Sequence, residues 1–232
     1  MKKFKKLIIF DLDGTLYQLR GGSYGRSLLR QAVLYNAQKF IACHLNITQT
    51  KAGKILNTLQ KKYGEDISIA LEKEYAINRN DYFKIVWNIP AKGIIKIGFN
   101  AQFMLRSLKK KCKIILVSEA PLIWIIHVLQ ELKIQNFFRG SIFSGEGDNR
   151  KRSGNVFKQV MEKFNMRPVD CISVGDQEKT DIIPAQKIGM QTIFLSQYKK
   201  SHFATFNVKN IPNLERKLLQ LLQGDKPKTS DR

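Results

Sequence analysis

Short, almost wholly apolar segments alternate with amphipathic segments along much of the chain. The first apolar segment follows a run of lysines, and similar segments recur after residue 96. The stretches between them carry apolar residues at three-to-four spacing, which is typical of helices with one buried side. Apolar strands that alternate with helices predict a parallel sheet covered on both faces, so the expected fold class is α/β with a Rossmann-like three-layer core. The predicted strands are 7–10, 113–118, 141–144, 171–176 and 191–195, and the predicted helices of this part are 99–111, 121–132, 154–164 and 182–188.

A block without strands interrupts the alternation after the first strand. A polar stretch leads into four helical patterns, and Pro90 closes the block. This all-helical insert of about seventy residues is longer than a crossover connection needs. We therefore expect a core, an inserted helical lobe, a terminal helix and a disordered tail. The expected core is 1–17 with 96–205, the lobe is 18–95 with helices at 27–45, 48–63, 66–75 and 80–88, and the remaining part, 206–232, holds a terminal helix at 212–222 and a tail at 224–232.

The chain carries a net charge of +21, from 40 basic against 19 acidic residues. A field of this sign attracts anions, including phosphorylated metabolites and nucleic acid. The lysines, however, are spread through every segment, no basic stripe carries interleaved aromatic residues, and the sequence holds no nucleic-acid-binding motif. We therefore expect a solvated, lysine-rich surface and no nucleic-acid partner.

Composition also bears on the compartment. Hydrophobic residues make up 43% of the chain, but no apolar run approaches the roughly 18 residues that a membrane span needs. The basic start imitates a secretory signal, yet the apolar stretch behind it is too short and ends at Asp11. Cys43, Cys112 and Cys171 are scattered and lack metal-ligand spacing. We therefore expect reduced thiols in a cytoplasmic protein that does not contact membranes.

Two carboxylates stand directly after the first apolar strand. Asp11 and Asp13 project to the same side of an extended chain because side chains alternate between its faces. Their repulsion costs stability, and such a pair persists most readily when a cation lies between them or when one acid stays protonated. Gly14 allows a sharp exit from the strand, and Thr15 adds a hydroxyl donor. The sequence therefore predicts a catalytic arrangement at this strand end.

Other polar residues follow the later strands at the corresponding points. Ser118 ends the second strand, and Asp176 follows Gly175, with Asp181 five residues further on. Lys151 precedes the helix that leads into the strand at 171–176. Because open parallel sheets bind ligands beyond the carboxyl ends of their strands, we expect these side chains to belong to one site.

The order of these motifs resembles the haloacid dehalogenase-like (HAD) hydrolase superfamily. Each motif alone is weak, but Asp-x-Asp-Gly-Thr, strand–Ser, Lys and Gly-Asp-x-x-x-x-Asp in this order are specific. The helical insert resembles that family's helical cap of the first type. Within the superfamily, the start from Phe10 to Tyr17 and the stretch Lys62–Gly64 look like pyrimidine 5′-nucleotidase and phosphoglycolate phosphatase relatives.

The resemblance implies a role for each aspartate. Asp11 would attack phosphorus and form an aspartyl-phosphate. Asp13 would protonate the leaving oxygen and then activate the water that hydrolyses this intermediate. Mg²⁺ would take oxygens from Asp11, the backbone carbonyl of Asp13, and Asp176. Asp181 would lie behind them and orient a metal-bound water or Lys151.

The resemblance also implies a phosphate-binding set. Thr15, Ser118 with the neighbouring amides at Glu119, and Lys151 would bind the oxygens that do not react. Glu119 stands where relatives usually carry a small neutral or amide residue, and its carboxylate would oppose phosphate, pair with a basic residue or point away. Arg152 replaces a common proline after the motif lysine.

The implied activity is a Mg²⁺-dependent phosphatase acting on a small phosphate monoester. A nucleotide, a sugar phosphate and phosphoglycolate all remain open as substrates, with Arg20, Tyr24 and Arg26 as candidate specificity contacts. Asp13 argues against halide displacement, because no leaving oxygen needs a proton in that reaction. A phosphomutase shares the same motifs and stays open. A second hypothesis, motivated by Glu119 and the net charge, is a catalytically weak relative that binds RNA or an acidic protein.

Overall fold

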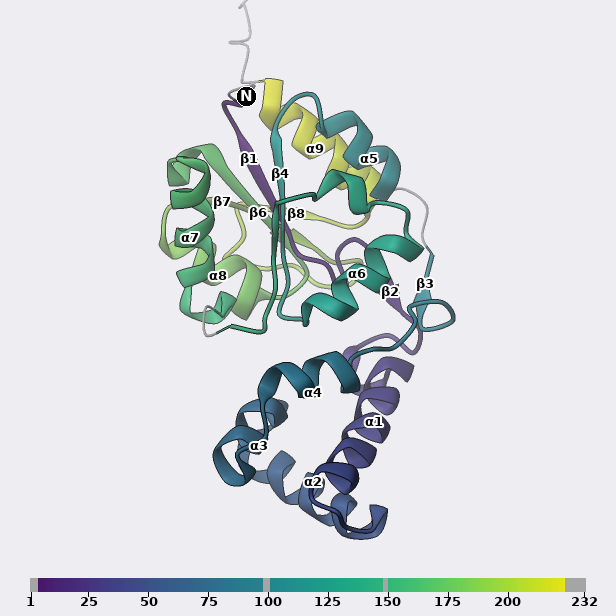
Figure 1. Ribbon diagram of the computed structural model, residues 1–232. Coiled ribbons are helices and arrows are strands. Elements are labelled where there is room, and N and C mark those ends of the chain that lie inside the picture. Colours follow the sequence, from purple (N-terminus) through teal and green to yellow (C-terminus); the bar gives the residue numbers. More distant parts are fainter. Residues whose placement is uncertain (1–3, 98–100, 148–149, 224–232) are drawn as a thin grey trace, which may run out of the picture. The chain divides into compact units, whose positions relative to one another are not determined.

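The computed structural model describes residues 4–97, 101–147 and 150–223 and divides into two compact units (Figure 1). The predicted tail at 224–232 lies outside the described residues. The core unit comprises Met1–Gln18, Ile97–Glu119 and Leu132–Arg232, and the helical unit comprises Leu19–Lys96 and Ala120–Glu131.

The core unit is built on a six-stranded sheet in the order β5-β4-β1-β6-β7-β8, with every described pairing parallel. The central strand β1 pairs with β4 on one side and β6 on the other, so that Phe10 lies opposite both Leu116 and Val174. The carboxyl ends of these three strands therefore meet at one edge of the sheet. The strands are β1 (Leu7–Phe10), β4 (Lys113–Val117), β5 (Ile142–Phe143), β6 (Cys171–Gly175), β7 (Gln191–Leu195) and β8 (Phe206–Val208).

Helices flank this sheet, and the predicted α/β class with a three-layer, Rossmann-like core is confirmed (Figure 1). All four residues of β1 are buried, as expected for a strand covered on both faces. Val156 and Phe157 pack with Leu7 and Ile115 in one apolar cluster, while α5 contacts α9. The helices of the core unit are α5 (Ala101–Leu108), α7 (Asn155–Phe164), α8 (Ile183–Lys187) and α9 (Ile211–Gln223).

Two elements of the core differ from the sequence prediction. Strand β8 was not predicted, and it pairs with β7 so that Ile193 lies opposite Phe206. Three residues with a central, exposed Asn207 carry too little pattern to be recognised as a strand. The helix predicted at 182–188 is preceded by a wide π-type turn, η5 (Glu178–Ile182), and α8 follows it.

The helical unit contains the four helices that the sequence predicts in the insert, within two residues at each end. Their starts follow from capping, since Ser27 and Thr48 accept hydrogen bonds from the amides three residues on. Phe40 and Tyr82 meet edge to face with ring centroids 5.6 Å apart. The elements are β2 (Gln18–Leu19), α1 (Leu28–His44), α2 (Gln49–Tyr63), α3 (Ile67–Tyr75), α4 (Arg79–Val86), β3 (Ile95–Lys96) and α6 (Leu122–Glu131).

Helix α6 groups with this unit by its contacts. The His127 Nδ1 atom lies 2.8 Å from the carbonyl oxygen of Ile89, a hydrogen bond that ties α6 to the end of the insert. The division into residues 1–17 with 96–205 and residues 18–95 stays a proposal. No helix in the described part of the chain has the length and apolarity to cross a membrane.

Candidate active site

Three carboxylates meet beyond the carboxyl ends of β1 and β6. One oxygen from each of Asp11, Asp176 and Asp181 lies within 4.8 Å of the others. The strand register explains the meeting of the first two, because Phe10 pairs with Val174 and the Asp11 amide donates to the Val174 carbonyl at 2.9 Å. Three negative charges this close repel one another strongly, so the cluster favours a bound cation or the protonation of a carboxyl group.

One cation is supplied by the chain itself. The Lys151 Nζ atom lies 2.5 Å from Asp11 Oδ1 and 2.7 Å from Asp181 Oδ1, and only 3% of the residue is exposed. Burial by itself lowers the pKa of Lys151, but the charges of Asp11 and Asp181 outweigh this effect and raise it above the ordinary value. The lysine is therefore a permanent positive charge at the site.

Burial lowers the pKa of a lysine, but it raises the pKa of a carboxyl group. Burial raises the pKa of Asp11, which Lys151 partly offsets. The same two influences leave the pKa of Asp181 at about 6. For Asp176, burial and then the charges of Asp11 and Asp181 raise the pKa to about 8. One positive charge thus falls short of neutralising the cluster.

The residues present fit a small, hard divalent cation. The donors are all carboxylate oxygens, as Mg²⁺ prefers. The Oδ1 atom of Asp176 is buried and has no hydrogen-bond partner among the described residues. An orphaned acceptor of this kind is costly unless a ligand occupies it. We therefore expect Asp176 to be the residue whose environment changes most when a metal binds.

Two glycines make room for these carboxylates. Gly14 has a φ of +88°, and a Cβ atom there would lie 2.2 Å from Asp176 Oδ2. At Gly175, a Cβ atom would lie 2.2 Å from Asp181 Oδ2. Any larger residue at either position would displace a carboxylate, so the spacing of the cluster depends on both glycines.

Asp13 lies beside the cluster with a different set of partners. Its Oδ2 atom accepts a hydrogen bond from Ser118 Oγ at 3.2 Å, and Oδ1 accepts one from the Tyr17 hydroxyl. Thr15 Oγ1 donates to Asp11 Oδ2 at 3.0 Å. Two hydroxyl donors hold the Asp13 carboxyl group in one orientation, which suits a group that must deliver a proton to a fixed point.

Glu119 has its side chain engaged within the core unit. Oε1 accepts a hydrogen bond from the Lys151 amide at 2.7 Å, and Oε2 lies 3.0 Å from Arg150 Nη1. Of the three possibilities left open by the sequence, the side chain adopts the pairing with a basic residue. The carboxylate thereby anchors the 3₁₀ segment η3 (Lys151–Ser153), which carries the buried lysine.

The sequence matches the family described as haloacid dehalogenase-like hydrolase over residues 8–195. The chain belongs to this family. It is 25% identical to glyceraldehyde 3-phosphate phosphatase of Pyrococcus furiosus, over 90% of this chain and 91% of the relative. It is 22% identical to human N-acylneuraminate-9-phosphatase, over 83% of each. A crystal structure of a HAD phosphatase from Thermococcus onnurineus has a TM-score of 0.64 and 15% identity, covering 92% of this chain and 97% of that one, and shows the shared fold.

The predicted membership of the superfamily is thus confirmed, and with it the prediction of a hydrolase of the phosphatase type at the level of the family. Asp11, Asp13, Ser118 and Asp176 follow the carboxyl ends of strands of the hydrolase, whereas Lys151 lies in η3 and Asp181 in η5. Tyr17 was missed, although its position four residues after Asp13 offered a signal. The roles of these residues remain predictions.

The three candidate specificity residues lie in the helical unit of the hydrolase. Arg20 Nε donates to the Ile95 carbonyl at 3.3 Å. The Tyr24 ring stacks on Trp87 with centroids 6.3 Å apart, and Arg26 is exposed. Their part in substrate selection stays a prediction.

We expect Asp176→Asn to stabilise the hydrolase in the absence of divalent ions. Because the folded pKa of Asp176 is raised from 3.8 to about 8, the folded state binds the proton more tightly than the unfolded state. Wild-type stability should therefore decrease as the pH rises from about 4 to 8, and the variant should show a weaker decrease, because only the raised pKa values of Asp11 and Asp181 remain. At pH 8.5 in EDTA, urea denaturation should show a gain of about 1–3 kcal/mol, because the neutral amide removes a buried charge that Asp11 and Asp181 repel.

Added Mg²⁺ provides the matching control. It should raise the unfolding temperature of the wild type and leave Asp176→Asn nearly unchanged, since ligands stabilise only the state that binds them. Equal stabilisation of both proteins by Mg²⁺ would contradict a metal site at this carboxylate.

Proposed function

We propose that this hydrolase is a Mg²⁺-dependent phosphatase that cleaves small phosphate monoesters through a phosphoaspartyl group on Asp11. The observation that carries the proposal is the combination of a buried carboxylate, Asp11, with Lys151 at 2.5 Å and an oriented acid, Asp13, two residues away. A nucleophile, a positive charge and a proton donor are the parts that phosphoryl transfer requires.

In the first step, an Asp11 carboxylate oxygen would attack phosphorus. The bond from phosphorus to the ester oxygen breaks as the new bond forms, and Asp13 gives its proton to the departing oxygen. The hydroxyl groups of Tyr17 and Ser118 hold Asp13 for this transfer. The products of this step are an alcohol and phosphorylated Asp11.

In the second step, Asp13 would accept a proton from water while the water oxygen attacks phosphorus. The aspartyl carboxylate is released, and inorganic phosphate leaves. The overall reaction consumes one water and regenerates both aspartates. Throughout, Lys151 would neutralise charge on the phosphoryl oxygens, with the hydroxyl groups of Thr15 and Ser118 as neutral donors.

Asp11, Asp176 and the backbone carbonyl of Asp13 would hold the metal ion, with the Asp181 carboxylate next to them. When bound, Mg²⁺ neutralises negative charge on the transferring group. The fit rests on the all-oxygen donor set and on the unpartnered Oδ1 atom of Asp176.

We further propose a phosphorylated carbohydrate as the substrate class. The named relatives act on glyceraldehyde 3-phosphate and on an N-acylneuraminate phosphate, both small phosphorylated carbohydrates. Transfer of phosphate to a second sugar, as in a phosphomutase, is the alternative fate of phosphorylated Asp11. The hypothesis of a weak catalyst that binds RNA loses one of its motives, because the Glu119 carboxylate pairs with Arg150. A cytoplasmic location also remains a proposal.

Phosphate release from a panel of monoesters tests this function. We expect turnover of sugar phosphates with Mg²⁺ and none in EDTA. Asp13→Asn should lower kcat by about 10²–10⁴-fold, the usual contribution of general acid–base catalysis. Equal rates with and without Mg²⁺, or an unchanged rate in Asp13→Asn, would contradict the mechanism. Transfer of label to a second sugar in place of free phosphate would establish the mutase.

A further inference from the structure

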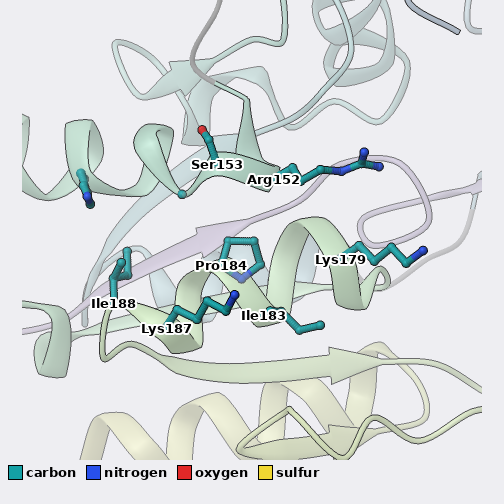
Figure 2. A pocket seen from close by; sticks show the side chains of 9 residues that line it. Arg152, Ser153, Lys179, Ile183, Pro184, Lys187 and Ile188 are labelled. Carbon is teal, nitrogen blue, oxygen red and sulfur yellow. The ribbon is translucent and has the colours of Figure 1, made fainter. Parts of the chain in front are cut away.

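A pocket of about 470 Å³ on the core unit is lined by cations and by no acidic side chain (Figure 2). It is bounded by η3, the start of α7, η5 and α8. Its volume falls in the range of about 300–1,000 Å³ that is usual for small-molecule sites. Four of its nine lining residues are basic, namely Arg152, Lys158, Lys179 and Lys187.

Among the described residues, no acidic side chain forms an ion pair with any of these four cations. In the same part of the chain, none of the four side chains forms a hydrogen bond. A second pocket, on the helical unit, differs in this respect, because its Arg30 pairs with Glu65 from the same lining. The high net charge of the chain explains many exposed lysines. It does not explain why four basic side chains line one pocket whose lining contains no acidic residue. Mutual repulsion in this group favours a bound anion.

The backbone adds to the positive field of the pocket. Helix α7 begins at Asn155 after Gly154, which has no side chain to cap the first turn, while the Ser153 hydroxyl group accepts a hydrogen bond from the Asn155 amide at 3.3 Å. Gly154 itself lines the pocket. The positive end of a ten-residue helix thus lies at the pocket wall and favours negative charge there.

Apart from Ser153 and Gly154, the remaining lining residues are apolar. Ile183 and Pro184 lie between Lys179 and Lys187 along the chain, and Figure 2 shows them on the same side of the pocket. A site for inorganic phosphate alone would need no such surface, whereas an organic group would gain from covering it. The nine lining residues include no aromatic side chain on which a nucleic-acid base could stack.

We propose that this pocket is a second anion site that binds a small organic molecule carrying two or more phosphate groups. Four cations match the charge of a diphosphate or triphosphate better than that of a monoester. The site is separate from the carboxylate cluster, but it uses the same two segments, since Arg152 follows Lys151 and Lys179 lies two residues before Asp181. A bound polyphosphate would hold together the segments that carry the buried Lys151–Asp181 pair.

Calorimetric titration with ADP in EDTA tests the proposal without relying on turnover. Lys179→Gln/Lys187→Gln should weaken binding at least tenfold, because both exposed cations leave the pocket. The matched control, Lys199→Gln/Lys200→Gln, removes the same charge elsewhere on the core surface and should change the Kd less than twofold. AMP should bind the wild type at least tenfold more weakly than ADP.

Several results would overturn the site. These are no ADP binding by the wild type at millimolar concentration, equal losses in both double variants, or equal affinities for AMP and ADP. If Ser118→Ala loses ADP binding while the pocket variant, Lys179→Gln/Lys187→Gln, retains it, then ADP binds at the catalytic centre. Stronger binding of an RNA oligonucleotide than of ADP, abolished by the pocket variant, would identify a nucleic-acid backbone as the ligand. None of these results depends on the proposed phosphatase activity.

Discussion

Asp11→Asn is expected to abolish turnover while leaving the fold intact. A carboxamide keeps the shape of the side chain but cannot attack phosphorus, so kcat should fall by about 10⁴-fold or more, as for other covalent nucleophiles. The loss is measured as phosphate release at saturating substrate and Mg²⁺. Acid-quenched wild-type protein should carry labelled phosphate at Asp11, and the variant should carry none.

Asp170→Asn is the matched control for this experiment. Asp170 is also a single carboxylate on the core unit, but it pairs with Arg167 and Lys6 at the surface. Its replacement should leave kcat within twofold of the wild type. Comparable rates from Asp11→Asn and wild type would refute the nucleophile and, with it, the proposed mechanism.

Lys151→Met should have the largest effect on stability. The side chains of Asp11, Lys151 and Asp181 are at most 8% exposed, so removing the lysine leaves two buried carboxylates without their positive partner. Breaking a buried pair in this way costs about 3–5 kcal/mol. Urea denaturation in EDTA at pH 8 should show this loss of stability. A separate assay of phosphate release with Mg²⁺ should show a loss of phosphatase activity.

The pH dependence separates this electrostatic cause from poor packing. Without Lys151, the pKa values of Asp11 and Asp181 rise further, so the folded variant takes up protons more readily than the unfolded chain. The destabilisation should therefore shrink as the pH falls from 8 to 5. Lys199→Met, which removes an exposed lysine, should stay within about 0.5 kcal/mol of the wild type at both pH values. A loss in Lys151→Met that is equal at pH 8 and pH 5 would contradict the electrostatic explanation.

The carboxylate cluster illustrates a conflict between stability and the proposed activity. Asp176 combines a raised pKa with an unpartnered buried oxygen. Such features lower the stability of the folded chain, and proteins retain them mainly at functional sites. The expected stabilisation by Asp176→Asn follows from this conflict.

Much of the fold could be predicted from local pattern. The strand at 7–10 is an unbroken apolar run, and two helices of the insert begin directly after Ser27 and Thr48, which have capping side chains. Strand β8 could not be predicted, because its identity depends on pairing with β7 rather than on its own residues. The wide turn η5 escaped prediction for a similar reason, since the Ser173 hydroxyl group donates to the Asp181 carbonyl across it at 2.8 Å.

The sequence by itself determined the class of the fold, the family, and the residues that gather at the strand ends. Apolar periodicity and the order of the motifs are local properties of the chain, and both survive into the structure. Only the tertiary structure decided which charged side chains pair with one another. It pairs Lys151 with Asp11 and Asp181, turns Glu119 toward Arg150, and leaves an oxygen of Asp176 without a partner in the described part of the chain. These pairings depend on the spatial distances between segments that are far apart in the sequence, because the energy of a charge interaction depends on the distance between the charges.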